Sequence, residues 1–93
     1  MTLSDLATVL HLRSDIRHTR VGGEGVVLRQ DDAEVLVVND VAARVIELLD
    51  GSRSLADIVE TLQQEYDIDA DTLAADIAAY GRDLTEAGVA ETS

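Results

Sequence analysis

Apolar and polar positions follow a strand-like pattern in the first part of the chain. Short runs that read as strands, two of them mostly apolar, are separated by turn sequences rich in Gly, Asp and Gln. These runs are residues 16–21, 26–29 and 35–38, and the turns between them are residues 22–25 and 30–33. The pattern predicts an antiparallel meander of three strands. Residues 10–13 also alternate, which allows an additional strand.

After residue 38, apolar residues recur every three or four positions, which predicts helices. The first helix is expected to begin after an Asn39 cap, to bury Val41, Val45 and Leu48, and to end at Gly51. Residues 52–54 are expected to form a loop. The second helix should start at Ser54, because Ser54 and an acidic residue three positions later fit a capping box.

A third helix is expected to begin after an Asp69 cap and to end at Gly88, with Val89 folding back onto Leu84. Its core face carries Leu73, Ile77, Tyr80 and Leu84. Beside that face runs a strip of small residues, Ala74, Ala78, Gly81 and Thr85. Small residues allow the close approach of another backbone, which is either the first helix of this protein or a bound peptide.

The order of these elements predicts an α+β fold that is winged-helix-turn-helix-like, with a three-stranded antiparallel sheet followed by three helices. Residues 10–90 should form a single domain, because 93 residues suffice for one small core. Residues 1–9 are expected to form a short N-terminal segment, either helical or frayed. Residues 91–93 form a C-terminal tail, and the end of the chain from Ala90 is expected to be frayed.

Composition narrows the classes of partner. Seven Arg and no Lys face nineteen carboxylates, which gives a formal net charge of −12. Such a charge disfavours nucleic acid and anionic membranes and favours neutral or basic peptides and proteins. The chain has no Cys, no apolar run long enough to span a membrane and no basic segment leading an apolar one. A cytoplasmic location is the simplest expectation.

No motif indicates catalysis, and we expect no catalytic residue, metal or cofactor. Residues 22–25 are rich in Gly, but no Gly-Lys-Ser/Thr follows them. Asp67, Asp69 and Asp71 have the spacing that opens a calcium loop, but Thr72 and Ala78 occupy the positions of its Gly and Glu. The two histidines have no recognisable partner group.

Each of two alternative functions would rest on a single feature of the sequence. The Ser54-Leu55 pair at a helix start matches part of the phosphopantetheine site of acyl and peptidyl carrier proteins, but Arg53 replaces the Asp and carrier domains are all-helical. A winged-helix regulatory domain would bind DNA. Here the hairpin precedes the helices, and the third helix carries four acidic residues against one Arg. Both observations disfavour that alternative.

The third strand, residues 35–38, is an edge of the predicted sheet and is apolar, uncharged and free of Pro. Proteins usually protect such an edge with charge, Pro or a bulge, because it can pair with another chain. Either the N-terminal segment covers this edge, or an extended peptide adds to it as a further strand.

Several segments resemble the PqqD family, whose members include the peptide chaperone of pyrroloquinoline quinone biosynthesis and the RiPP recognition elements. The resemblance rests on the order and spacing of these segments, and it covers about residues 10–91. The segments are Val21–Leu28, Val38-Asn39 before Ala42-Ala43, Leu48–Gly51, Leu62 with Glu65–Asp67, Asp76-Ile77, Leu84 and Gly88-Val89.

The resemblance implies a non-catalytic domain that binds the leader of a ribosomally made precursor peptide as an added strand. The leader would lie between the third strand and the third helix and be presented to a modifying enzyme, a radical SAM protein or a leader peptidase. By position, the implied peptide-binding residues are Val35, Leu36, Val37, Val38, Leu73, Ala74, Asp76, Ile77, Tyr80 and Arg82. Alternation places either Leu36 and Val38 or Val35 and Val37 toward the core.

Overall fold

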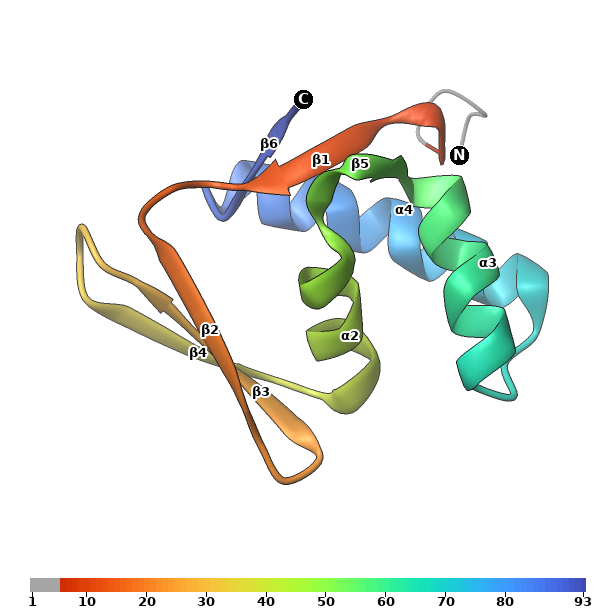
Figure 1. Ribbon diagram of the computed structural model, residues 1–93, viewed down its shortest axis with the longest axis horizontal. Helices are drawn as coiled ribbons and strands as arrows, with labels where there is room; N and C mark the ends of the chain where they lie inside the picture. Colours follow the sequence, from red (N-terminus) through yellow and green to blue (C-terminus); the bar gives the residue numbers. More distant parts are fainter. Residues whose placement is uncertain (1–5) are drawn as a thin grey trace.

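The structure is a computed structural model that describes residues 6–93, and these residues form two three-stranded sheets and three helices (Figure 1). In chain order the elements are β1 (Val9–Leu12), β2 (Ile16–Val21), β3 (Glu24–Arg29), β4 (Glu34–Val38), α2 (Asp40–Leu48), β5 (Asp50–Ser54), α3 (Leu55–Glu65), α4 (Ala70–Glu86) and β6 (Ala90–Thr92). The predicted α+β class, with an antiparallel meander followed by three helices, is confirmed. The N-terminal segment predicted for residues 1–9 lies partly outside the described residues.

The predicted meander is the sheet β2-β3-β4, which extends to one side of the helices (Figure 1). Its strands pair without a bulge, so that Arg17, Leu28 and Val35 form one cross-strand row and Thr19, Val26 and Val37 form another. The turn between β2 and β3 contains only Gly22 and Gly23, because Glu24 and Gly25 already belong to β3. It is therefore two residues shorter than the sequence indicated.

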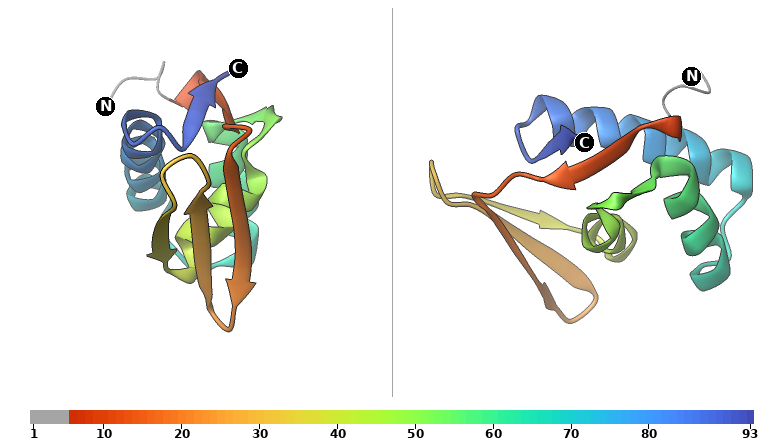
Figure 2. Two further views of the ribbon diagram at one scale, coloured as in Figure 1. Left: turned by 90° about the vertical axis from the view of Figure 1, so that its left-hand side faces the viewer. Right: turned by 45° about the horizontal axis from the view of Figure 1, so that its top comes forward.

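The second sheet has the order β5-β1-β6 and brings the C-terminal strand beside β1, next to α4 (Figure 2). Two predictions are corrected here: residues 52–54 belong to a strand rather than a loop, and residues 90–92 form a strand rather than a frayed end. Neither segment has an apolar alternation that would mark it as a strand. Pairing with β1 imposes the extended conformation on both.

The helix starts agree with the sequence. The Asn39 side chain accepts a hydrogen bond from the Ala42 amide at 2.9 Å, and the Asp69 side chain accepts one from the Thr72 amide at 3.0 Å. Ser54 and Asp57 form a reciprocal capping box at the start of α3. The first helix ends at Leu48, before the predicted stop at Gly51, because the chain enters β5 at Asp50.

The end of α4 is the predicted Schellman motif. The Val89 amide donates to the Leu84 carbonyl at 2.9 Å, and the Gly88 amide donates to the Thr85 carbonyl at 3.2 Å. Gly88 has a φ of +74°, a conformation that costs little without a Cβ. The motif turns the chain back so that Val89 is fully buried and β6 can pair with β1.

The core is aliphatic and lies between the helices and the two sheets. Its least exposed side chains come from β3, from the three helices and from the turn before β6: Val27, Val45, Ile46, Ile58, Leu62, Leu73, Ile77 and Val89. The small-residue strip of α4 packs at Gly81 against Leu10 and Leu55, where an added Cβ would lie 3.0 Å from Leu55 Cδ1. At Gly81 the strip therefore contacts β1 and the start of α3.

Candidate functional site

The edge of the β2-β3-β4 sheet at β4 is open. Among residues 6–93, β4 pairs only with β3, while β1 pairs with β5 and β6. Within this described part of the chain, the N-terminal segment does not cover this edge, which was the alternative that the sequence allowed; β1 pairs with β5 and β6 instead. Main-chain groups along one side of Glu34–Val38 remain available to another extended chain.

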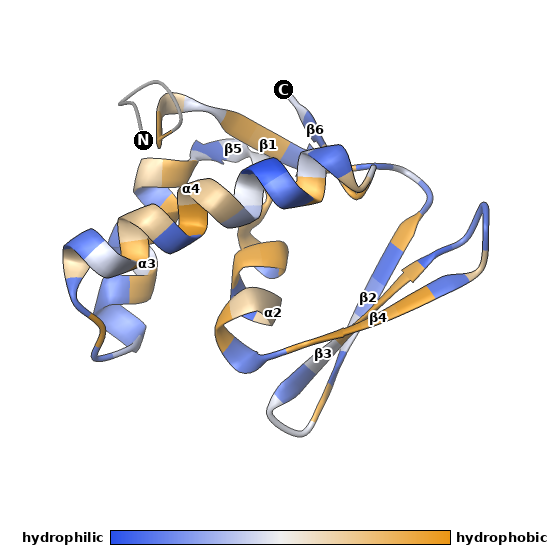
Figure 3. Ribbon diagram, turned by 180° about the vertical axis from the view of Figure 1, so that it is seen from behind, coloured by the Kyte–Doolittle hydropathy of each residue, from blue (hydrophilic) through white to orange (hydrophobic). Residues whose placement is uncertain are grey.

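The other three sheet edges carry the protection that β4 lacks. β2 is the sequence IRHTRV, with two Arg and a His, and β5 is DGSRS, with Asp and Arg. β6 has three residues, AET. Figure 3 shows most of β4 in hydrophobic colours and β5 mostly in hydrophilic ones. Only the edge at β4, EVLVV, combines apolar side chains with length.

The side chains of β4 point alternately toward and away from the core. Leu36 and Val38 are partly buried and pack against the core cluster, whereas Val35 and Val37 are 57% and 64% exposed. The structure thus selects the first of the two alternations. Val35 and Val37 lie on the outer sheet face, on which Val21 of β2 is also exposed. A peptide strand paired with β4 would lie beside the backbone of these four residues. Its side chains would neighbour Leu36 and Val38 on the inner face of the sheet and Val35 and Val37 on the outer face.

A cleft of about 440 Å³ opens directly after β4, between the start of α2 and α4. Four of the implied helix residues line it: Leu73, Asp76, Ile77 and Tyr80. Asn39, the residue that follows β4, lies at its border. The structure therefore brings these four helix residues next to the end of the open strand.

Two of the implied residues lie elsewhere. Arg82 lines a separate hollow of about 240 Å³ with Leu10, Leu55 and Gly81, on the side of α4 that faces β1 and α3. Ala74 belongs by helical spacing to the same strip as Gly81. Neither residue joins the cleft beside β4.

The cleft also contains residues that the sequence did not single out. Val41 and Val45 of α2 form part of its wall, and Asp83 of α4 lies at its border. The sequence assigned Val41 and Val45 only to the core. Asp83 could have been found from its spacing, because it lies seven residues after Asp76 and three after Tyr80 on the same side of a helix.

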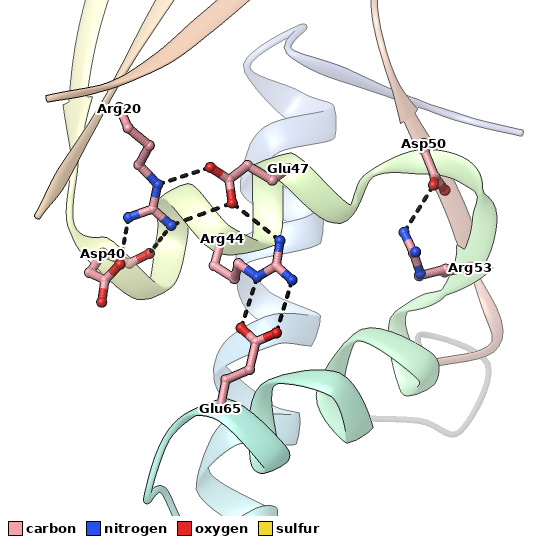
Figure 4. Close-up of polar contacts among 7 residues, drawn as sticks. All are labelled: Arg20, Asp40, Arg44, Glu47, Asp50, Arg53 and Glu65. Carbon is pink, nitrogen blue, oxygen red and sulfur yellow. Dashed lines mark hydrogen bonds and ion pairs between the residues drawn. The ribbon is translucent and has the colours of Figure 1, made fainter.

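A chain of ion pairs fixes the sheet to the helices behind β4 (Figure 4). Arg20 of β2 bonds both to Asp40 in the first turn of α2 and to Glu47, with Nε to Glu47 Oε2 at 2.9 Å. Arg44 then links Glu47 to Glu65 of α3, and its two bonds to Glu65 measure 2.8 and 2.9 Å. The network joins β2, α2 and α3 around the point where β4 enters α2.

These contacts shift the acidity of the groups concerned. The hydrogen bond from Arg20 lowers the pKa of Asp40 and of Glu47, and the hydrogen bonds from Arg44 lower the pKa of Glu65. In the cleft, burial and then the nearby Asp83 carboxylate raise the pKa of Tyr80. The hydroxyl of Tyr80 is buried and has no hydrogen-bond partner among the described residues.

Arg29 of β3 holds the other end of the sheet to α4. It donates to the Ala87 carbonyl, just after α4, at 2.8 Å and lies 3.4 Å from a carboxylate oxygen of Glu34 at the start of β4. The open edge is thus anchored to the helical part near both of its ends.

Ser54 has a structural role. Its Oγ accepts a hydrogen bond from the Asp57 amide at 3.1 Å, while the Asp57 carboxylate accepts one from the Ser54 amide. This geometry, together with two sheets, removes the basis for a carrier protein. In the part of the chain that the structure describes, no helix has the length and apolar character needed to cross a membrane.

An antiparallel sheet with an open apolar edge, set beside three helices, defines a winged-helix-like domain with a candidate peptide groove. The model of the family described as coenzyme PQQ synthesis protein D (PqqD) matches residues 24–90. The chain belongs to this family, as the sequence pattern indicated.

Curated relatives carry the name PqqA binding protein. One from Gluconobacter oxydans is 32% identical over 77 residues, which covers 83% of this chain and 78% of that protein. One from Xanthomonas campestris is 35% identical and covers 71% of this chain and 72% of that protein. One from Rhodopseudomonas palustris is 39% identical over 54 residues, and the match spans only about half of that protein, 53%.

Two solved structures share the fold. A lasso peptide synthetase B1 complexed with the leader peptide has a TM-score of 0.77 and 30% identity, and the match covers 89% of this chain and 98% of that one. TbiB1 in complex with the TbiA(beta) leader peptide has the same TM-score and 21% identity, with coverage of 87% and 94%. The second likeness concerns the fold alone.

Proposed function

We propose that this protein is a peptide-binding adaptor that takes up the leader of a ribosomally synthesised precursor peptide and presents it to a modifying enzyme. The leader adds to β4 as a fourth strand of the β2-β3-β4 sheet. The observation that carries the proposal is the contrast between β4 and the other three sheet edges, which are short or charged. The names of the relatives and the leader-bound B1 structure support the same function.

The contacts divide between main chain and side chains. The outward-facing amides and carbonyls of residues 35–38 provide affinity that does not depend on the peptide sequence. Selectivity comes from the side that faces the helices, where Leu36 and Val38 pack against the core and the cleft lined by Leu73 and Ile77 opens after them, at Asn39. We assign no part in peptide binding to Ala74 and Arg82, which lie on the opposite side of α4.

No catalytic step is assigned to this protein, and the chemistry belongs to its partner enzyme, a radical SAM protein or a leader peptidase. Pyrroloquinoline quinone synthesis is one pathway that fits the relatives' names, and lasso peptide synthesis fits the structural neighbours. The cytoplasm, where ribosomes make precursor peptides, is the proposed location.

The test is a titration of isotope-labelled protein, followed by NMR. The probes are synthetic leader segments of PqqA-type precursors and of the short peptides encoded beside this gene, each with a scrambled version as control. We expect saturable shifts at Val35–Val38, Leu73, Asp76, Ile77 and Tyr80 with one leader and none with its scrambled form. Binding by no leader, or shifts centred on β2 instead of β4, would refute the proposal.

A further inference from the structure

The cleft after β4 combines an apolar interior with an acidic border. Val41, Val45, Leu73 and Ile77 supply aliphatic surface, while Asp76, Tyr80 and Asp83 of α4 stand at the rim. Because Asp76 and Asp83 are seven residues apart with Tyr80 between them, the three side chains follow one side of the helix over two turns. One side of the opening therefore carries two carboxylates and a phenol.

Among residues 6–93, these rim groups have no ion-pair or hydrogen-bond partner. The described Arg side chains that form ion pairs are engaged with other carboxylates, and neither Asp76 nor Asp83 forms an ion pair with a described residue. The Tyr80 hydroxyl is buried without a hydrogen bond among these residues. A buried hydroxyl that forms no hydrogen bond has a free-energy cost, which a ligand group could remove.

We propose that this cleft binds a Lys or Arg side chain of the leader peptide. The inference rests on the proposed function, because the peptide strand on β4 brings the side chain to the cleft. The methylene groups pack on Val41, Val45 and Ile77, and the cationic head donates hydrogen bonds to Asp76 and Asp83 and to the Tyr80 hydroxyl oxygen.

A purely apolar side chain fits the same space less well. It would cover the aliphatic interior but would leave the buried Tyr80 hydroxyl without a hydrogen-bond partner, which has a free-energy cost. An acidic side chain would add a third negative charge, in a chain whose net charge is already −12. A long cation matches both the apolar interior and the acidic border.

The strand geometry also sets the position of the basic residue within the leader. Side chains of an added strand alternate, so those on the side of Leu36 and Val38 face the helices. The peptide residue beside Val38 is nearest the cleft, because Asn39 and Val41 follow directly. The residue two positions away lies beside Leu36. The leader should therefore carry a Lys or Arg two residues from an aliphatic residue.

The experiment is a double-mutant cycle measured by calorimetry. In a leader that binds, each Lys and Arg is replaced in turn by norleucine, which keeps an aliphatic stem and removes the charge. The protein is used as the natural chain and as the Asp76→Asn/Asp83→Asn variant. A control variant, Asp71→Asn/Glu86→Gln, removes the same charge from α4 away from the rim carboxylates.

We expect one norleucine replacement to weaken binding to the natural chain roughly ten-fold, the range of charge-assisted hydrogen bonds at a partly exposed site. The same replacement should have little effect, less than about two-fold, on binding to the Asp76→Asn/Asp83→Asn variant. The Asp71→Asn/Glu86→Gln variant should keep the full ten-fold difference.

Three outcomes would overturn the inference while leaving the proposed function intact: equal affinity of all norleucine leaders, an equal loss with both protein variants, or tight binding of a leader without Lys or Arg. Failure of every leader to bind would instead refute the proposed function itself. The Tyr80→Phe variant adds a separate readout. It should unfold at a higher temperature than the natural chain but bind the basic leader more weakly, whereas a phenol with only a packing role would leave that affinity unchanged.

Discussion

The two sheets of this protein have the same number of strands, but their edge strands differ in length and polarity. The β5-β1-β6 sheet ends in a polar strand on one side and a three-residue strand on the other, and both flank β1. The β2-β3-β4 sheet protects only its β2 edge, with Arg and His. An unprotected apolar edge invites pairing with another chain. The difference indicates that one sheet completes the fold and the other receives a ligand.

The contrast extends to how each sheet is attached. The β2-β3-β4 sheet lies against α2 at Gly25, where an added Cβ would stand 2.6 Å from Ala43 Cβ and 3.1 Å from Val38 Cγ2. At Gly81, the corresponding close contact near β1 involves the end of a flexible side chain, Leu55 Cδ1 at 3.0 Å. A Cβ atom is held in place by the backbone and cannot move aside as easily as the terminal atoms of a flexible side chain.

The largest effect is therefore expected from Gly25→Ala. It should lower the free energy of unfolding by about 1–3 kcal/mol, because β3 must move away from α2. The displacement should also weaken leader binding, since Val38 is one of the contacted residues. Denaturant unfolding and calorimetry measure the two effects.

Gly81→Ala is the matched variant on the other side of the core. Better helix propensity, worth about 1 kcal/mol, offsets the contact with Leu55, so we expect a change within about 1 kcal/mol and unaltered leader affinity. Equal destabilisation by the two variants would contradict the view that the β2-β3-β4 sheet is the more tightly constrained attachment.

A second prediction concerns the Arg20 network. The carboxyls of Asp40 and Glu47 have ordinary pKa values of 3.8 and 4.5, and Arg20 lowers both in the folded state. Groups with a lowered folded-state pKa stabilise the protein above their unfolded pKa and lose that effect as the pH falls through the folded value. Arg20→Met should thus reduce the melting temperature at pH 7 and show a smaller further decrease on acidification below about pH 4.5 than the natural chain.

Arg17→Met is the control for that measurement. Arg17 lies in the same strand and donates only to main-chain carbonyls, those of Ser14 and Ile16. Its variant should follow the acid profile of the natural chain. Identical profiles for the Arg20 and Arg17 variants would mean that the network does not contribute to the attachment of β2 to α2.

The smallest expected effect comes from a pair of variants, one at each edge of the β2-β3-β4 sheet. Val37 of β4 and Thr19 of β2 lie in one cross-strand row with Val26 between them. Val37→Thr should weaken leader binding by up to about five-fold, the range of one cross-strand neighbour pair. Thr19→Val, the reverse change at the opposite edge, should leave the affinity unchanged. A larger loss from the Thr19 variant would place the peptide on β2.

The elements that the sequence predicted are marked by features of their own residues, such as apolar runs, turns and helix caps. In the open sheet, β3 and β4 carry apolar runs bounded by turns, and the helices carry caps that act within three residues, as at Asn39 and Asp69. β5 and β6 have no such signal. Their sequences, DGSRS and AET, become strands only because β1 offers them main-chain partners.

The candidate site divides in a similar way. Leu73, Ile77 and the inward side chains of β4 follow from periodicity; Leu73 and Ile77 line the cleft, and Leu36 and Val38 pack against the core before it. Arg82 and Ala74 could not be placed, because the rotation of α4 about its axis depends on contacts such as Gly81 with Leu10 and Leu55. The role of Val41 and Val45 in the cleft wall likewise depends on how α2 and α4 pack.

Amide hydrogen exchange in β4 tests strand addition most directly. In the free protein β4 is bonded on one side only, so alternate amides within Val35–Val38 should exchange slowly and the others fast. A bound leader should slow the fast set and so remove the alternation, while the amides of β2 keep their rates. Binding that leaves the alternation in β4 unchanged, or that protects the outer amides of β2 instead, would contradict this account of the protein.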